Sequence, residues 1–153
     1  MSEAPDGPSR APLRAGFVID TLAPGAGTEN QLILLLRHLD RARVRPALCC
    51  LWENAALAEL APDVPVLTLG FHRIASRRGA RGIARLRRWA RAETDVLVTF
   101  FRDSNIVGTL AGRWAGVPVI SSRRNLGYWH TRRELALLRV LNRMTTRFVA
   151  NSE

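Results

Sequence analysis

The residues best suited to bind a ligand belong to the glycine-rich segment APGAGTEN, residues 23–30. Gly25 and Gly27 let the backbone approach a ligand closely, because glycine carries no Cβ atom. Thr28 and Gln31 have the spacing of a capping box, which predicts that a helix begins here. The free N–H groups and the dipole at a helix N-terminus attract negative groups. Gly25, Gly27 and Thr28 are therefore candidates to bind a phosphate.

This loop matches neither of the common glycine motifs for nucleotides. Asn30 occupies the position of the third glycine in the dinucleotide-binding fingerprint. A P-loop needs a lysine, and the chain has none, because all 23 of its basic residues are arginine. A tight turn between a strand and a helix, with no ligand, is the alternative interpretation of the same residues.

Two more polar segments directly follow apolar runs of strand length. Residues 102–105 follow the run at 95–101, and residues 123–130 follow the run at 117–122. A guanidinium group stays protonated and can hold a phosphate by two parallel hydrogen bonds, although simple solvation at the surface is the alternative. The candidates for contact with a phosphate or a second substrate are Arg102, Asp103, Arg123, Arg124 and Asn125.

The elements that must position these residues alternate along the chain. Strands are expected at residues 17–19, 45–52, 64–70, 95–101, 117–122 and 146–150. Helical patterns lie between them, which is typical of an α/β protein with a Rossmann-like, doubly wound parallel sheet. In such a sheet the loops after the strands share the carboxyl edge, so Gly25 and Arg123 are predicted to lie at one edge.

Helices are expected at residues 28–39, 54–60, 73–91, 106–114 and 131–144. In the first of these helices, four leucines recur at the spacing i, i+3, i+4 and i+7, which predicts one buried face. They are Leu32, Leu35, Leu36 and Leu39.

The segment from Arg73 to Arg91 is the most basic part of the chain. Ile83, Leu86 and Trp89 line one helical face, and arginines cover much of the rest. A solvated surface helix is one interpretation of this pattern. Contact with an anionic membrane, with Trp89 at the boundary, is the other. No nucleic-acid partner is expected, because the sequence has no RNA- or DNA-binding motif and no aromatic stacking platform.

Length and composition favour one domain located in the cytoplasm. The chain has 153 residues and a net charge of +10, which attracts anionic partners. No apolar run approaches the ~20 residues that span a bilayer. Residues 1–14 lack the order of a signal peptide and are expected to form a disordered tail.

Cys49 and Cys50 are expected to be reduced core residues, and the scattered histidines indicate no metal site.

Three segments together resemble the N-terminal domain of family 4 glycosyltransferases of the GT-B fold. They are APGAGTENQL after the first strand, VTFFRDSNIVGTLAGRWAGVPVISSRRNLGYW in the middle, and LLRVLNRMTTRFVANSE at the end. The likeness runs from about Gly16 to Glu153. It implies a Rossmann-like domain at residues 15–153 that forms the acceptor-side, N-terminal half of a GT-B enzyme.

The resemblance also implies an activity, the transfer of a hexose from a nucleotide-sugar to a glycan or lipid-linked acceptor, as in cell-envelope polysaccharide synthesis. Gly25 and Gly27 would approach the donor diphosphate, with no metal or other cofactor. The C-terminal domain that holds most of the nucleotide is missing from this sequence, so the fragment is expected to be inactive alone. Retention of configuration is a family expectation. The expected location is the cytoplasm, with peripheral contact at the inner face of the membrane.

The exit of the fifth strand departs from the family pattern. Many members place a histidine there, whereas this sequence reads Ser122, Arg123, Arg124 and Asn125. Arginine cannot act as a neutral general base, so no residue receives a catalytic role. Two other functions remain open: a stand-alone Rossmann-like module that binds a phosphate ligand, and a basic protein that binds a membrane surface or nucleic acid.

Overall fold

The computed structural model describes residues 11–23, 25, 27–53, 62–123 and 132–150. Within them, six strands form one sheet in the order β3-β2-β1-β4-β5-β6, and every neighbouring pair is parallel. This confirms the predicted doubly wound α/β fold. The strands are β1 (Leu13–Ile19), β2 (Val44–Cys50), β3 (Val66–Thr68), β4 (Val96–Thr99), β5 (Val119–Arg123) and β6 (Arg147–Ala150).

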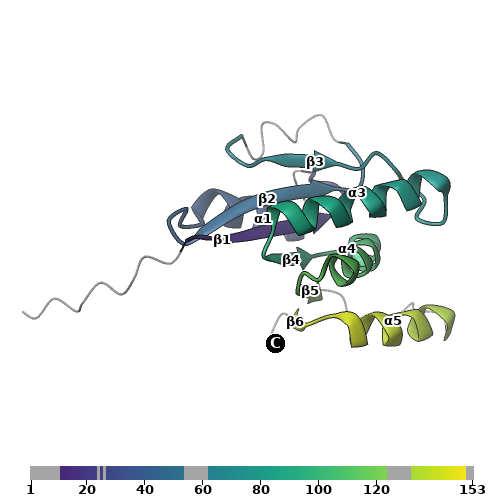
Figure 1. Cartoon of the computed structure of the whole chain (residues 1–153). Coiled ribbons are helices and arrows are strands. Elements are labelled where there is room, and N and C mark those ends of the chain that lie inside the picture. Colours follow the sequence, from purple (N-terminus) through teal and green to yellow (C-terminus); the bar gives the residue numbers. More distant parts are fainter. Residues whose placement is uncertain (1–10, 24, 26, 54–61, 124–131, 151–153) are drawn as a thin grey trace, which may run out of the picture.

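Helices cover both faces of this sheet. In Figure 1, α3 and α4 lie on the near face and α1 lies behind the sheet, while α5 contacts α4. None of the described helices is long and apolar enough to cross a membrane. The helix predicted at residues 54–60 lies outside the described residues. The helices are α1 (Gly27–His38), α3 (Arg77–Glu93), α4 (Arg102–Ala115) and α5 (Arg132–Met144).

The central strand β1 is buried on both sides, because its side chains point alternately to the two faces. Phe17 and Ile19 belong to the core under α1, whereas Val18 belongs to the core under α3 and α4. Nearly continuous apolarity, rather than strict alternation, is typical of a strand covered on both faces. The short edge strand β3 follows Pro65, as expected for a residue that cannot donate to a ladder.

The amino end of β1 lies slightly earlier than the expected domain start at residue 15. β1 begins at Leu13, and the guanidinium of Arg14 pairs with Asp95 just before β4, at 2.7 Å between Nη2 and Oδ1. The backbone N–H of Arg14 donates to the other carboxylate oxygen at 2.9 Å. These hydrogen bonds from Arg14 hold the pKa of Asp95 below its usual value. Residues 1–10 of the expected tail lie outside the described part.

The prediction for the first helix is wrong at one position. Leu32 and Leu36 are buried and Leu39 is half-buried, but Leu35 is 44% exposed, and Ile33 points into the core instead. Successive helical residues are about 100° apart, so the apolar run from Leu32 to Leu36 can face the core in two ways. One buried stripe would contain Leu35 and the other Ile33, and Leu32 and Leu36 belong to both. The sheet selects the stripe with Ile33, which leaves Leu35 on the outer side.

Candidate functional site

The sheet order reverses between β1 and β4, and the loops beyond their carboxyl ends surround the candidate site. In open parallel sheets this switch point is where ligands bind. The structure places Gly25 after β1, Arg102 and Asp103 at the start of α4 after β4, and Arg123 at the end of β5. These four predicted residues therefore follow strands at the same edge, whereas Arg124 and Asn125 lie outside the described residues.

The glycine loop after β1 is open beside the start of α1. Gly25 has a φ of +102°, a conformation that other residues rarely adopt. Its N–H donates to Oδ1 of Asn30 at 3.4 Å, so the asparagine at the third glycine position closes the loop onto the helix. Gly27 has no positive φ, and a Cβ added to it would meet nothing within 4 Å. Gly27 therefore provides access rather than an unusual conformation.

Helix α1 begins at Gly27, so Thr28 lies inside its first turn rather than at the capping position. The capping box predicted from Thr28 is therefore displaced from the actual helix start. Thr28 still belongs to the turn whose N–H groups have no acceptor within the helix. Gly25, Gly27 and Thr28 thus remain together at the N-terminus of α1.

Asp20, the residue directly after β1, caps helix α4 from another strand. Its Oδ1 accepts a hydrogen bond from the backbone N–H of Ser104 at 2.8 Å. Phe101, which precedes α4, offers no side-chain acceptor. The carbonyl of Asp20 accepts from the N–H groups of Leu51 and Trp52 at 3.0 and 3.1 Å. Asp20 therefore joins the carboxyl ends of β1 and β2 to the start of α4.

The environment of Asp20 affects its charge in two opposite ways. Burial raises the pKa of its carboxyl above the usual value, and the hydrogen bonds from Ser104 oppose that rise. Because this carboxylate already accepts from the first turn of α4, an anionic ligand would compete with it there. The N-terminus of α1 beside Gly27 is the more open helix end for a phosphate.

At the start of α4, Arg102 and Asp103 form an ion pair with 3.2 Å between Nη1 and Oδ1. Their side chains are 55% and 25% exposed, so solvent screens the pair and it contributes little to stability. A carboxylate in the first turn is favourable to the helix dipole. The pair therefore places one charge of each sign at the rim of the site.

Asn105 holds the floor of the site together, a role that the sequence did not reveal. Its Oδ1 accepts from the hydroxyls of Thr99 and Ser121 at 2.5 and 2.7 Å. Its Nδ2 donates to the carbonyl of Phe100 at 2.8 Å. One side chain of α4 thus fixes the carboxyl ends of β4 and β5.

Next to Asp20, the buried hydroxyl oxygen of Thr21 has no hydrogen-bond partner within the described protein.

The two cysteines do not contribute a nucleophile. Cys49 and Cys50 are free and buried in the core, which confirms the prediction. Burial raises the pKa of Cys50 to about 12 and that of Cys49 well above its usual value, so both remain thiols. Among the described residues, no three His, Cys, Asp or Glu side chains gather as a metal site would require.

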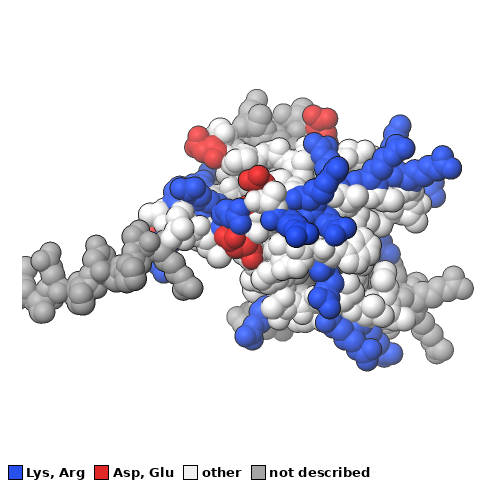
Figure 2. All heavy atoms as spheres, viewed as in Figure 1, with Lys and Arg blue, Asp and Glu red and all other residues white. Residues whose placement is uncertain are grey.

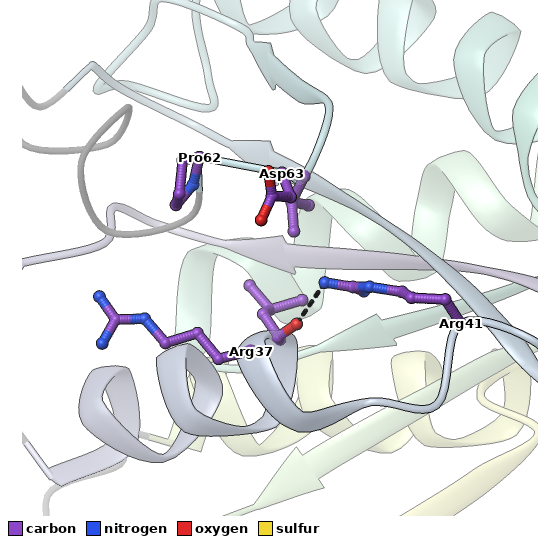
Figure 3. Close-up of a pocket in the computed structure, with 6 residues that line it drawn as sticks. Arg37, Arg41, Pro62 and Asp63 are labelled. Atoms are coloured by element: carbon purple, nitrogen blue, oxygen red, sulfur yellow. Dashed lines mark hydrogen bonds between the residues drawn. The ribbon is translucent and has the colours of Figure 1, made fainter.

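A hollow of about 300 Å³ lies at the opposite edge of the sheet (Figure 3), near the C-terminus of α1 and the residues before β3. There, Nη2 of Arg41 donates to the carbonyl of Leu36 at 2.6 Å, and Arg37 and Asp63 line the opening. This hollow is separated from the carboxyl edge by the length of the strands. It is therefore distinct from the candidate site.

One of the two interpretations of residues 73–91 placed Trp89 at a membrane boundary, but in the structure this side chain packs against the core. Trp89 is half-buried and packs against the cluster under α3 and α4. The absence of a side chain at Gly16 provides its space, because a Cβ there would lie 2.9 Å from the Trp89 ring. The exposed tryptophan of this face is Trp114 on α4, which is 55% exposed.

Comparison with known proteins gives matches to one enzyme family. A model described as glycosyltransferase family 4 matches residues 25–153. The structure of HepE from Anabaena in complex with UDP and glucose has a TM-score of 0.71 and 22% identity, covering 92% of this chain and 38% of HepE. A second HepE structure, in complex with UDP, has the same coverage at 20% identity.

The apo form of the lipopolysaccharide outer core galactosyltransferase WaaB has a TM-score of 0.60 and 11% identity, covering 71% of this chain and 32% of WaaB. At these identities the structural likeness shows the fold, and the chain spans well under half of each protein. No curated protein sequence gives a match. The family model, however, covers most of the chain. The chain therefore belongs to glycosyltransferase family 4.

Proposed function

We propose that this chain is the acceptor-side domain of a glycosyltransferase that moves a hexose from a nucleotide-sugar to a glycan or lipid-linked acceptor. The family match over residues 25–153 carries this proposal. The chain spans 38% of HepE, which supports a second domain that holds most of the nucleotide. HepE was crystallised with UDP and glucose, so a UDP-sugar is the first donor to test.

On the donor side, Gly25, Gly27 and Thr28 would receive the diphosphate. Three features support this role: the open space beside Gly27, the positive φ of Gly25, and the helix dipole of α1. Backbone N–H groups and arginines would stabilise the leaving diphosphate, and we propose no metal ion for this step.

On the acceptor side, the rim after β4 and β5 would contact the second substrate. Asp103 can accept hydrogen bonds from sugar hydroxyls, while Arg102, Arg123 and Arg124 can hold a phosphate, with Asn125 as a neutral partner. We propose that the protein works in the cytoplasm, at the inner face of an anionic membrane that it contacts through the segment from Arg73 to Arg91.

The experiment that tests this function compares donor turnover by the chain alone with turnover by a longer protein that joins it to a nucleotide-binding domain. The chain alone is expected to show none, because a two-domain cleft orients and stabilises the transition state from both sides. The longer protein should release UDP only when acceptor is present. Acceptor-dependent turnover by the chain alone would contradict the division of roles. Failure of both proteins across a panel of nucleotide-sugars and acceptors would contradict the activity and favour a phosphate-binding module.

Two variants of the longer protein locate the site. Arg123→Ala should lower kcat/KM by about 10- to 100-fold, the loss expected for one charge-assisted hydrogen bond. Arg85→Ala, on the outer side of α3, should leave transfer to a soluble acceptor unchanged. An equal loss in both variants would place the chemistry elsewhere.

A further inference from the structure

The outer side of α3 carries seven arginines, all exposed, which together we call the arginine face. In Figure 2 this side of the molecule shows basic side chains gathered over α3. Within the described residues, none of the seven has a carboxylate within 4.0 Å, because the ion pairs found there involve only Arg14 and Arg102. The arginine face consists of Arg77, Arg78, Arg81, Arg85, Arg87, Arg88 and Arg91.

This distribution of charge is unfavourable for the helix itself. Arg77 and Arg78 occupy the first turn of α3, where the helix dipole disfavours cations, and this turn contains no acidic residue. Arg81 and Arg85 continue the series at a spacing of four residues, at which like charges repel. Ser76 still caps the helix by accepting from the N–H of Gly79 at 2.9 Å. An external anionic partner would relieve the repulsion that the fold leaves uncompensated.

Two contacts hold part of the arginine face in place. Nη1 of Arg85 donates to the carbonyl of Thr68 in β3 at 3.0 Å, and Nε of Arg87 donates to the carbonyl of Trp114 in α4 at 3.1 Å. These bonds fix two guanidinium groups against neighbouring elements while both residues remain exposed. The second bond also places the arginine face directly beside the exposed Trp114.

We propose that the arginine face and Trp114 form a docking surface for an anionic lipid bilayer. The negative surface potential of an anionic leaflet attracts arginines, and the indole of a tryptophan is favourable at the level of the lipid headgroups. One exposed tryptophan is not a stacking platform for single-stranded nucleic acid, and the sequence has no motif for a duplex. The bilayer therefore fits this surface better than nucleic acid does.

The direction of α3 connects this surface to the candidate site. The chain enters α3 after the carboxyl end of β3 and leaves it before β4, so Arg77 and Arg78 lie toward the carboxyl edge of the sheet. Arg87 and Trp114 lie toward the amino edge, because α3 ends before β4 and α4 ends before β5. Docking would therefore lay the α3 side of the domain along the bilayer, where a lipid-linked acceptor resides, with the carboxyl edge at one end of the contact. This purpose rests on the proposed function, whereas binding itself depends only on the charge and Trp114.

The test is flotation of the 153-residue chain with vesicles of phosphatidylcholine alone and with added phosphatidylglycerol. Binding is expected only to the anionic vesicles and should weaken as salt is raised. Each arginine contributes about fivefold in affinity near such a surface, so Arg78→Glu/Arg81→Glu/Arg88→Glu should lose at least about 100-fold. Trp114→Ala should also weaken binding to the vesicles. The salt dependence of that binding should change less than it does in the triple arginine variant.

The matched control reverses three exposed arginines away from α3, in Arg37→Glu/Arg43→Glu/Arg45→Glu, and has the same net charge. It should bind anionic vesicles nearly as well as the original chain. If circular dichroism shows that Arg78→Glu/Arg81→Glu/Arg88→Glu unfolds, the same three arginines are replaced by glutamine, and vesicle binding is measured with that variant instead.

Three results would overturn the docking surface: no binding to anionic vesicles, an equal loss in the control variant, or binding to duplex DNA in preference to vesicles. Binding that is lost in the α3 variant, while donor turnover fails in the longer protein, would keep the docking surface and reject the enzyme function. If the longer protein turns over donor with a soluble acceptor but the chain does not bind vesicles, the enzyme function is kept and the docking surface is rejected.

Discussion

Replacement of Leu36 by alanine is expected to lower the free energy of unfolding by about 2–5 kcal/mol. Leu36 has no exposed surface and packs between α1 and the sheet with Leu32 and Ile33. The substitution removes buried methyl groups and leaves a cavity that a two-sided sheet core can close only in part. Denaturant melts followed by circular dichroism measure the change.

Leu35→Ala is the control within the same helix. Leu35 is 44% exposed, and alanine has the highest helix propensity, so the expected change is below about 0.5 kcal/mol. Equal losses at Leu35 and Leu36 would mean that α1 is rotated relative to the orientation described above. A loss only at Leu35 would contradict the packing of this face altogether.

The second large effect is expected at Asp20. Asp20→Ala removes the acceptor for the N–H of Ser104 and leaves that first-turn amide of α4 without its partner, which should cost about 1–3 kcal/mol. Asp20→Asn keeps an acceptor oxygen in place and removes a partly buried charge, so its cost should be clearly smaller. Equal destabilisation by both variants would show that the carboxyl oxygen does not cap α4.

The pH dependence of stability distinguishes the charge of Asp20 from its hydrogen bond. Because burial raises the pKa of Asp20 in the folded state, the folded protein binds this proton more readily than the unfolded chain. The contribution of Asp20 to stability therefore increases as pH falls from its raised pKa toward the usual value of 3.8. Asp95 has the opposite sign, since Arg14 lowers its pKa and its stabilisation is lost as pH falls through that lowered value. Asp20→Asn should remove only the first of these two dependences, as measured by melts from neutral to acid pH.

Most of the fold could be predicted from the sequence because the signals are local. The six apolar runs have strand length, and each is separated from the next by enough chain for a crossover. The stripe of α1 could not be assigned, since the run from Leu32 to Leu36 is apolar throughout and only the sheet decides which side faces inward. The position of Trp89 likewise depends on the space above Gly16, which lies on a distant strand.

The candidate site was only partly predictable. The glycine loop is visible because its unusual residues are adjacent in sequence. The cap on α4 is not, because Asp20 and Ser104 are 84 residues apart and neither residue alone differs from an ordinary polar residue at a strand end. Asn105 could be placed near the site, but its bonds to Thr99 and Ser121 required the pairing of β4 with β5.

The central claim is that the diphosphate of a nucleotide-sugar meets the glycine loop at the start of α1. Gly27→Val tests this cleanly, because the residue has no positive φ, an added Cβ would meet nothing within 4 Å, and valine is more favourable than glycine in a helix. Gly25→Val is a poorer test, since its φ of +102° would strain the backbone whether or not a ligand binds there.

The most direct measurement is a titration with UDP of the longer protein that joins this chain to a nucleotide-binding domain, monitored through the backbone amide resonances of this chain's residues in that protein and in its Gly27→Val variant. We expect the largest shifts at Gly25, Gly27 and Thr28, and a strong reduction of these shifts in the variant while its melting temperature is retained. Shifts confined to Arg37, Arg41 and Asp63 around the hollow at the opposite edge would contradict the assignment, as would no shift at the glycine loop at saturating UDP.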